Sequence, residues 1–231
     1  MKKLKIKNYK KNKRKPKFDQ NLTVNCNPFF KELLMEFYKD KEVVEIGPGK
    51  GFYSSILRTV SSKLELIQID SKFSKELIKD NYSVLNIDFK KWILEEESFK
   101  ENLKKTYTLF SSLPYSQLKF LFSCNLFFEG YFIAPNYILQ KKGCFSNYLR
   151  YCYEIKVISK IPNQYFSPEP SLSSSYLYIK KRINFSYSLF KKTFNKSLGV
   201  LGKITSNEKL KRKRLHQLTV EEISEILKDK N

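Results

Sequence analysis

A glycine-rich turn between an apolar run and a helical pattern is the segment best suited to bind a ligand. It reads EIGPGKG at residues 45–51, directly after the β-branched pair VV. Glycines at such a turn let the backbone approach a ligand closely, and the helix that follows offers its N-terminal amides. The turn alone does not distinguish a dinucleotide, a phosphate group and S-adenosylmethionine.

Two acids stand where the next two predicted strands end. LELIQID ends at Asp70, about 20 residues beyond the turn, where an acid can accept hydrogen bonds from both hydroxyls of a ribose. SVLNID ends at Asp88, which is placed to accept from an adenine amino group. Either acid alone is equally typical of a helix cap. Because both follow successive strands beside the glycine turn, together they indicate a nucleoside cofactor site.

A fourth predicted strand, within TYTLFSSLPY, runs into Ser112-Leu113-Pro114-Tyr115. A polar residue followed by proline and an aromatic side chain suits a flat ring that carries an exocyclic amine. The polar group and a neighbouring carbonyl would accept from the amine, and Tyr115 would stack. Since the lone pair of such an amine is conjugated into the ring, geometry matters more than a strong base. Taken alone, the stretch reads as a plain proline turn.

Other chemistries fit the sequence less well. The turn lacks the G-x-x-x-x-G-K-[ST] spacing of a P-loop. A nicotinamide dehydrogenase would need a hydride-transfer partner that the chain does not clearly supply. His216 is the only histidine, and no C-x-x-C pair occurs, so we expect no metal site. The four cysteines read as buried thiols of a reducing, cytosol-like compartment: Cys26, Cys124, Cys144 and Cys152.

The elements that position these residues alternate as strand, turn and helix, which predicts an α/β fold with a parallel sheet. A helix over residues 27–39, with Asn27 as its N-cap and Pro28 in its first turn, comes first. Further strands are expected within 131–142, at the end of 147–162 and over 173–182. From about Phe185 the pattern becomes helical and basic, and it closes with a helix that Thr219 caps.

Charge indicates the partner. Lys and Arg total 44 against 23 acids, a formal charge of +21. A lysine-rich composition explains part of this excess, but basic residues cluster at 2–17 and at 209–214 (KLKRKR). Nucleic acid is the first candidate partner, and an anionic membrane surface is the second. No run approaches the roughly 20 apolar residues of a membrane span. The basic start lacks the apolar run of a secretory signal and the serine and arginine bias of an organellar transit peptide.

In this order and spacing, the motifs resemble the KsgA/Erm family of rRNA adenine N6-methyltransferases over roughly residues 18–180. They comprise DQNL (19–22), EIGPGKG (45–51), QID (68–70), NID (86–88), SLPY (112–115), ILQKK (138–142) and FSPEP (166–170). The tail is similar to the small helical domain of the KsgA branch, in shortened form. KKTFNKSL (191–198) resembles its basic segment, and RLHQLTVEEISEIL (214–227) its closing helix.

The resemblance implies a Rossmann-like class I methyltransferase sheet and a shortened C-terminal helical domain. A disordered basic arm (1–17), an S-adenosylmethionine-dependent domain (18–184) and a basic helical RNA-binding domain (185–231) are expected. By this likeness the cofactor would be contacted by Gln20, Asn21, Leu22, Glu45, Gly47, Gly49, Gly51, Asp70, Ser71, Asp88, Phe89 and Ser112. The target amine would lie among Ser112, Leu113 and Tyr115, and Phe166 would stack on the flipped adenine.

Three readings of function follow. The first is an active enzyme that dimethylates small-subunit rRNA during ribosome assembly in the cytoplasm, as a monomer, with an organellar matrix as the second location. The family has asparagine where this chain has Ser112, and serine offers one hydroxyl instead of a carbonyl and an amide. The second reading is therefore an RNA-binding assembly or transcription factor with little catalysis. The third is an Erm-like enzyme that acts on large-subunit rRNA and confers macrolide resistance.

Overall fold

The computed structural model describes residues 21–98, 106–124, 126, 128–135, 144–182, 187–194 and 205–229. Some expectations from the sequence lie outside these residues: the basic arm (1–17), Asp19 and Gln20, the ILQKK segment (138–142) and the second half of KKTFNKSL (195–198). The glycine turn, both acids, the SLPY segment and FSPEP all lie within them.

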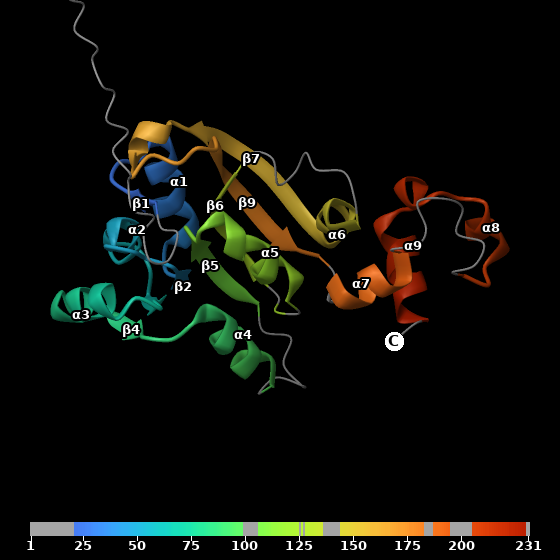
Figure 1. Cartoon of the computed structure of the whole chain (residues 1–231), viewed down its shortest axis with the longest axis horizontal. Coiled ribbons are helices and arrows are strands. Elements are labelled where there is room, and N and C mark those ends of the chain that lie inside the picture. The colour runs from blue at the N-terminus through green and yellow to red at the C-terminus, as the bar shows by residue number, and fades with distance from the viewer. Residues whose placement is uncertain are drawn as a thin grey trace, which may run out of the picture.

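A seven-stranded sheet in the order β4-β3-β2-β5-β6-β9-β7 forms the centre of the molecule (Figure 1). Its strands are β2 (Glu42–Ile46), β3 (Lys63–Ile67), β4 (Ser83–Leu85), β5 (Tyr107–Ser111), β6 (Phe128–Pro135), β7 (Tyr153–Ile161) and β9 (Ser174–Lys181). The pairs β2–β3, β2–β5, β3–β4 and β5–β6 are parallel, as predicted. A separate pair joins β1 (Leu22–Thr23) to β8 (Phe166–Ser167).

The last strand departs from the predicted parallel sheet. β9 lies between β6 and β7 and is antiparallel to both. The reason is the connection: residues 162–173, between β7 and β9, contain a single turn of 3-10 helix (Asn163–Tyr165) and the two-residue β8 but no α-helix. A parallel return needs a crossover that is usually an α-helix, and without one the chain turns back antiparallel. Consequently β9 is the one sheet strand here that runs away from the edge at which the others end.

Two helical layers enclose the sheet, and the strands supply alternate side chains to each. The layers comprise α1 (Pro28–Tyr38) and α2 (Phe52–Leu57) on one side and α4 (Phe89–Ser98), α5 (Tyr115–Ser123) and α6 (Cys144–Cys152) on the other. Within β5, Leu109 joins the core under α4–α6, and Phe110 joins the core under α1 and α2. The predicted cap of α1 is confirmed, because the Asn27 side chain accepts from the Phe29 amide.

The tail contains α7 (Tyr187–Phe194), α8 (Glu208–Lys211) and α9 (Val220–Lys228). Thr219 caps α9 as predicted, in a capping box with Glu222. The core under α4–α6 continues into the tail through apolar side chains that include Phe190, Ile223 and Leu227, all essentially unexposed. Because α7 follows β9, the tail begins at the edge of the sheet opposite the ends of the parallel strands, and Figure 1 shows α7, α8 and α9 at that end.

No helix in the described part of the chain has both the length and the apolar composition of a membrane span.

Candidate active site

A cavity of about 540 Å³ lies where β2, β3 and β5 end. Its volume is within the roughly 300–1,000 Å³ of small-molecule sites. Ten of the residues expected at a site line it: Asn21, Leu22, Gly47, Gly49, Asp88, Phe89, Ser112, Leu113, Tyr115 and Phe166. Glu45, Gly51, Asp70 and Ser71 are described but do not line it.

The glycine turn forms one wall of the cavity. Gly47, Gly49 and Gly51 all have positive φ, at 77°, 57° and 82°. A Cβ on Gly49 would lie 2.8 Å from Cδ2 of Leu22, and one on Gly47 would lie 3.2 Å from Cδ2 of Leu113. The turn therefore requires glycine for its backbone conformation and for the space in front of it. Gly51 also has to be glycine, but for a contact outside the cavity: a Cβ on Gly51 would clash with Leu77 of α3 (Ser71–Lys79).

At the end of β3 the polar residue that lines the cavity is Gln68, not Asp70. Asp70 is the N-cap of α3, and its side chain accepts from the Lys72 amide at 2.9 Å. Gln68 is 1% exposed; it donates to the Gly49 carbonyl at 3.4 Å and accepts from the Asp70 amide at 3.0 Å. The helix-cap interpretation thus describes Asp70, while Gln68 was not foreseen. Its sequence signal is a polar residue directly after the strand, two positions before the acid.

Asp88 both caps a helix and faces the cavity. One of its oxygens accepts from the Lys90 amide at 2.9 Å, at the start of α4. Asn86, two residues earlier, donates to the Gln68 carbonyl at 2.7 Å and so ties the end of β4 to the end of β3. The apolar side chains of Ile69 and Ile87 line the same part of the cavity. A carboxylate between apolar walls suits a flat heterocycle that carries an amino group.

Ser112 is held by the glycine turn. Its hydroxyl donates to the Gly47 carbonyl at 2.9 Å, which links the end of β5 to the end of β2. Because a hydroxyl has one proton and two lone pairs, this bond leaves Ser112 able to accept further hydrogen bonds but not to donate one. Pro114 precedes α5, and the ring of Tyr115, the first residue of that helix, is half-buried at the cavity.

Phe166 comes from the separate β1–β8 pair, in which it is the register partner of Thr23. It lines the cavity, but only 5% of its surface is exposed, and it belongs to the core under α1 and α2. The face that it offers to a ligand is therefore small in this structure.

Glu45 lies beneath the turn and is completely buried. The Ser54 hydroxyl donates to its Oε2 at 2.6 Å, while its Oε1 has no hydrogen-bond partner within the described ranges. Burial disfavours the charged carboxylate and raises the pKa of Glu45 to about 8, although the Ser54 bond opposes the shift. Glu45 thus attaches α2 to the end of β2 behind the turn.

Among the residues that the structure covers, no three His, Cys, Asp or Glu side chains come together as a metal site would need. The arrangement instead offers a glycine cradle, a carboxylate between apolar walls, and a hydroxyl and an aromatic ring at one end.

Comparison with known proteins identifies the family to which a chain with these features belongs. The sequence model described as "Ribosomal RNA adenine dimethylase" matches residues 11–226. A ribosomal RNA small subunit methyltransferase A of Malacoplasma penetrans is 30% identical over 196 residues, covering 76% of this chain and 69% of the relative. An rRNA adenine N-6-methyltransferase of Limosilactobacillus reuteri is 28% identical over 186 residues, covering 74% of this chain and 72% of the relative.

Solved structures agree on the fold. A dimethyladenosine transferase from Plasmodium falciparum aligns with a TM-score of 0.61 at 15% identity, covering 88% of this chain and 95% of that one. The 23S rRNA methyltransferase ErmE aligns with a TM-score of 0.60 at 13% identity, covering 88% and 97%. The chain belongs to the ribosomal RNA adenine dimethylase family and is an S-adenosylmethionine-dependent rRNA adenine N6-methyltransferase.

Proposed function

We propose that this enzyme dimethylates adenine in small-subunit rRNA during assembly of the subunit, in the cytoplasm and as a monomer. The observation that carries the proposal is that one cavity unites the glycine turn, Asp88 and the SLPY segment. The choice of subunit is supported by the helical tail, whose sequence resembles the KsgA branch, and by the Malacoplasma penetrans relative, a small-subunit methyltransferase by name.

The cofactor would lie along the wall formed by Gly47 and Gly49, where a Cβ at either position would occupy the space in front of the turn. When bound, S-adenosylmethionine supplies an electrophilic methyl group on a positively charged sulfur. Asp88 would accept from the adenine amino group between Ile69 and Ile87. Gln68, in place of the expected Asp70, would face the ribose hydroxyls.

Other expected cofactor residues would act at the edges of this site. Asn21 and Leu22 line the cavity beside the turn, and Gln20 precedes them in the chain. Glu45, Gly51 and Asp70 would hold the turn and the neighbouring helices from behind, and Ser71 begins α3. We therefore expect substitutions of the latter group to affect folding of the site more than direct contact with the cofactor.

The target amine would be oriented by Ser112 as an acceptor. Its only proton is directed to the Gly47 carbonyl, so the lone pairs remain for an N–H of the amine. A bond of this kind strengthens as the nitrogen acquires positive charge, because hydrogen bonds to charged groups are the stronger ones. The methylated nitrogen can then release its extra proton to water, so that a strong base is not required.

The substrate adenine would be turned out of the RNA to enter the cavity, since a stacked and paired base hides its amine. Tyr115 would stack on it from the start of α5. Phe166, which is 5% exposed, would contribute a ring edge unless the β1–β8 pair moves when RNA binds.

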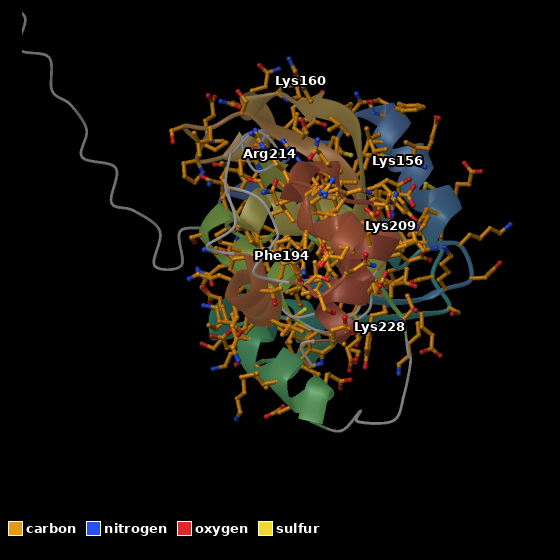
Figure 2. The ribbon with its side chains drawn as sticks, turned by 90° about the vertical axis from the view of Figure 1, so that its right-hand side faces the viewer. Lys156, Lys160, Phe194, Lys209, Arg214 and Lys228 are labelled. Carbon is orange, nitrogen blue, oxygen red and sulfur yellow. The ribbon has the colours of Figure 1, made fainter. Side chains whose placement is uncertain are left out.

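The RNA backbone would be held by basic side chains outside the cavity. Within the described tail, Lys211 pairs with Glu208 and Lys213 with Glu222, whereas no acid partner is found there for Lys209, Arg212 or Arg214. Figure 2, a view onto the tail, shows Lys209 and Arg214 together with the β7 lysines, of which Lys160 lies at the upper margin. Exposed cations suit phosphate contacts.

The test is transfer of labelled methyl groups from S-adenosylmethionine to small ribosomal subunits that lack the 3′-end dimethyladenines. Naked large-subunit rRNA serves as the parallel substrate and the Asp88→Ala variant as the inactive control. Label in the small subunit alone supports the proposal. Label in the large-subunit RNA alone would assign an Erm-like activity, and no transfer to either despite intact cofactor and RNA binding would favour a binding role. Sedimentation velocity of the protein tests the monomer.

A further inference from the structure

A hydrogen bond joins the hydroxyls of Tyr115 and Ser174, which are 59 residues apart in the sequence. Tyr115 begins α5 and lines the cavity, whereas Ser174 begins β9 and is fully buried. Either oxygen can be the donor. The bond therefore connects the aromatic residue at the target end of the cavity to the interior of the sheet.

The two partners are held to different degrees. Ser174 is paired with Pro135 of β6 and with Ile161 of β7, so its backbone has a neighbouring strand on each side. Tyr115 follows Pro114 at the junction of a loop and a helix, and its ring is only half-buried. The serine is thus the fixed partner, and the tyrosine is the one whose side chain can change direction.

We propose that Ser174 is a positioning residue that fixes the direction of the Tyr115 ring at the target adenine. This inference rests on the proposed function, in which Tyr115 stacks on the base. A hydroxyl bond at the far end of the ring prevents the side chain from swinging into the cavity or away from it. Catalytic geometry of this kind depends on support from outside the residues that touch the substrate.

Ser174 is more deeply buried than Tyr115, so the loss of one hydroxyl does not have the same effect as the loss of the other. Removing the Tyr115 hydroxyl leaves the Ser174 hydroxyl buried without this partner, which is costly for a group that water cannot reach. Removing the Ser174 hydroxyl leaves the tyrosine hydroxyl on a half-exposed side chain, where water can replace the lost bond. Loss of positioning and loss of stability can therefore be separated by choosing the residue that is changed.

The experiment compares Ser174→Ala, Tyr115→Phe and the double variant with the wild-type enzyme and with Ser173→Ala, an exposed serine one residue away. For Ser174→Ala we expect kcat to fall by about 10-fold or more, with KM for RNA and the Kd of S-adenosylmethionine nearly unchanged. Tyr115→Phe should lower Tm by about 3 °C. The double variant should recover most of that Tm but not kcat, and Ser173→Ala should behave as wild type.

Two results would overturn the inference: a wild-type kcat for Ser174→Ala, or Tm changes that add in the double variant as if the residues were independent. The thermal measurements need no RNA, so they test the bond even if the wild-type enzyme methylates neither subunit. In that event the proposed function fails, and the Tm comparison alone decides whether Tyr115 and Ser174 are coupled.

Discussion

Replacement of Ser112 by alanine removes the acceptor that we assign to the target amine and changes little else. Within the described residues, the serine hydroxyl makes one hydrogen bond, 2.9 Å to the Gly47 carbonyl, and both residues are half-buried. Water can reach a half-buried carbonyl, so the fold should lose no more than about 1 kcal/mol. The expected effect is therefore on the reaction.

Its size follows from how the hydrogen bond changes during transfer. A bond between neutral groups contributes about 0.5–1.5 kcal/mol, and one to a charged group about 1.5–3 kcal/mol. As the nitrogen becomes cationic, the Ser112 bond should strengthen by roughly 1–1.5 kcal/mol, which corresponds to about a 5- to 12-fold loss of rate in Ser112→Ala. Ser112→Asn should at least match the wild type, because an amide can donate to Gly47 while its carbonyl accepts from the amine.

Single-turnover transfer at saturating S-adenosylmethionine isolates this step, and calorimetry gives the cofactor Kd. Ser123→Ala is the matched control, because that hydroxyl also donates to a backbone carbonyl, of Lys119 in α5, but lies outside the cavity lining. A rate for Ser112→Ala within twofold of the wild type, with unchanged cofactor affinity, would refute the assignment of Ser112 as an acceptor.

Three further outcomes are expected. Gly49→Ala forces a side chain into positive φ and against Leu22, so calorimetry should show cofactor affinity reduced by about tenfold; an unchanged Kd would argue against the cradle. The pKa of Glu45 is about 8 in the folded protein and 4.5 ordinarily. At pH values between these two, folded Glu45 carries a proton that it releases on unfolding. Stability to urea should therefore fall as pH rises through this window, by up to about 1.4 kcal/mol per pH unit, and Glu45→Gln should flatten the dependence. Replacing Arg212 and Arg214 together by alanine should reduce the slope of log affinity for rRNA against log salt concentration by about 2. An unaltered slope would show that these two arginines do not contact the RNA backbone.

Local patterns predicted much of the fold because the physics behind them is local. The cap of α1 by Asn27 and that of α9 by Thr219 depend on a side chain and amides two or three residues away. The glycine turn follows from positive φ at successive glycines. The position of β9 between β6 and β7 depends on how strands from distant segments pair, and the alternation within residues 173–182 carries no information about the direction of the strand.

The site was predictable as a set of strand ends but not residue by residue. Two polar side chains, Gln68 and Asp70, follow β3 two positions apart, and which of them caps α3 depends on where that helix begins. Asp70 caps the first turn of α3 and does not line the cavity, whereas Gln68 does. The bond between Tyr115 and Ser174 lay beyond any sequence pattern, because it requires β9 to be threaded between β6 and β7.

The reversed course of β9 also sets a length scale for the substrate. Its eight residues carry the chain from the cavity edge to the tail, a distance of about 26 Å. If the adenine enters at one end and phosphates are held by Arg212 and Arg214 at the other, a short oligonucleotide can satisfy one end only. The enzyme would then favour RNA whose folding in the ribosomal particle holds the target adenine and the contacted phosphates at the required separation.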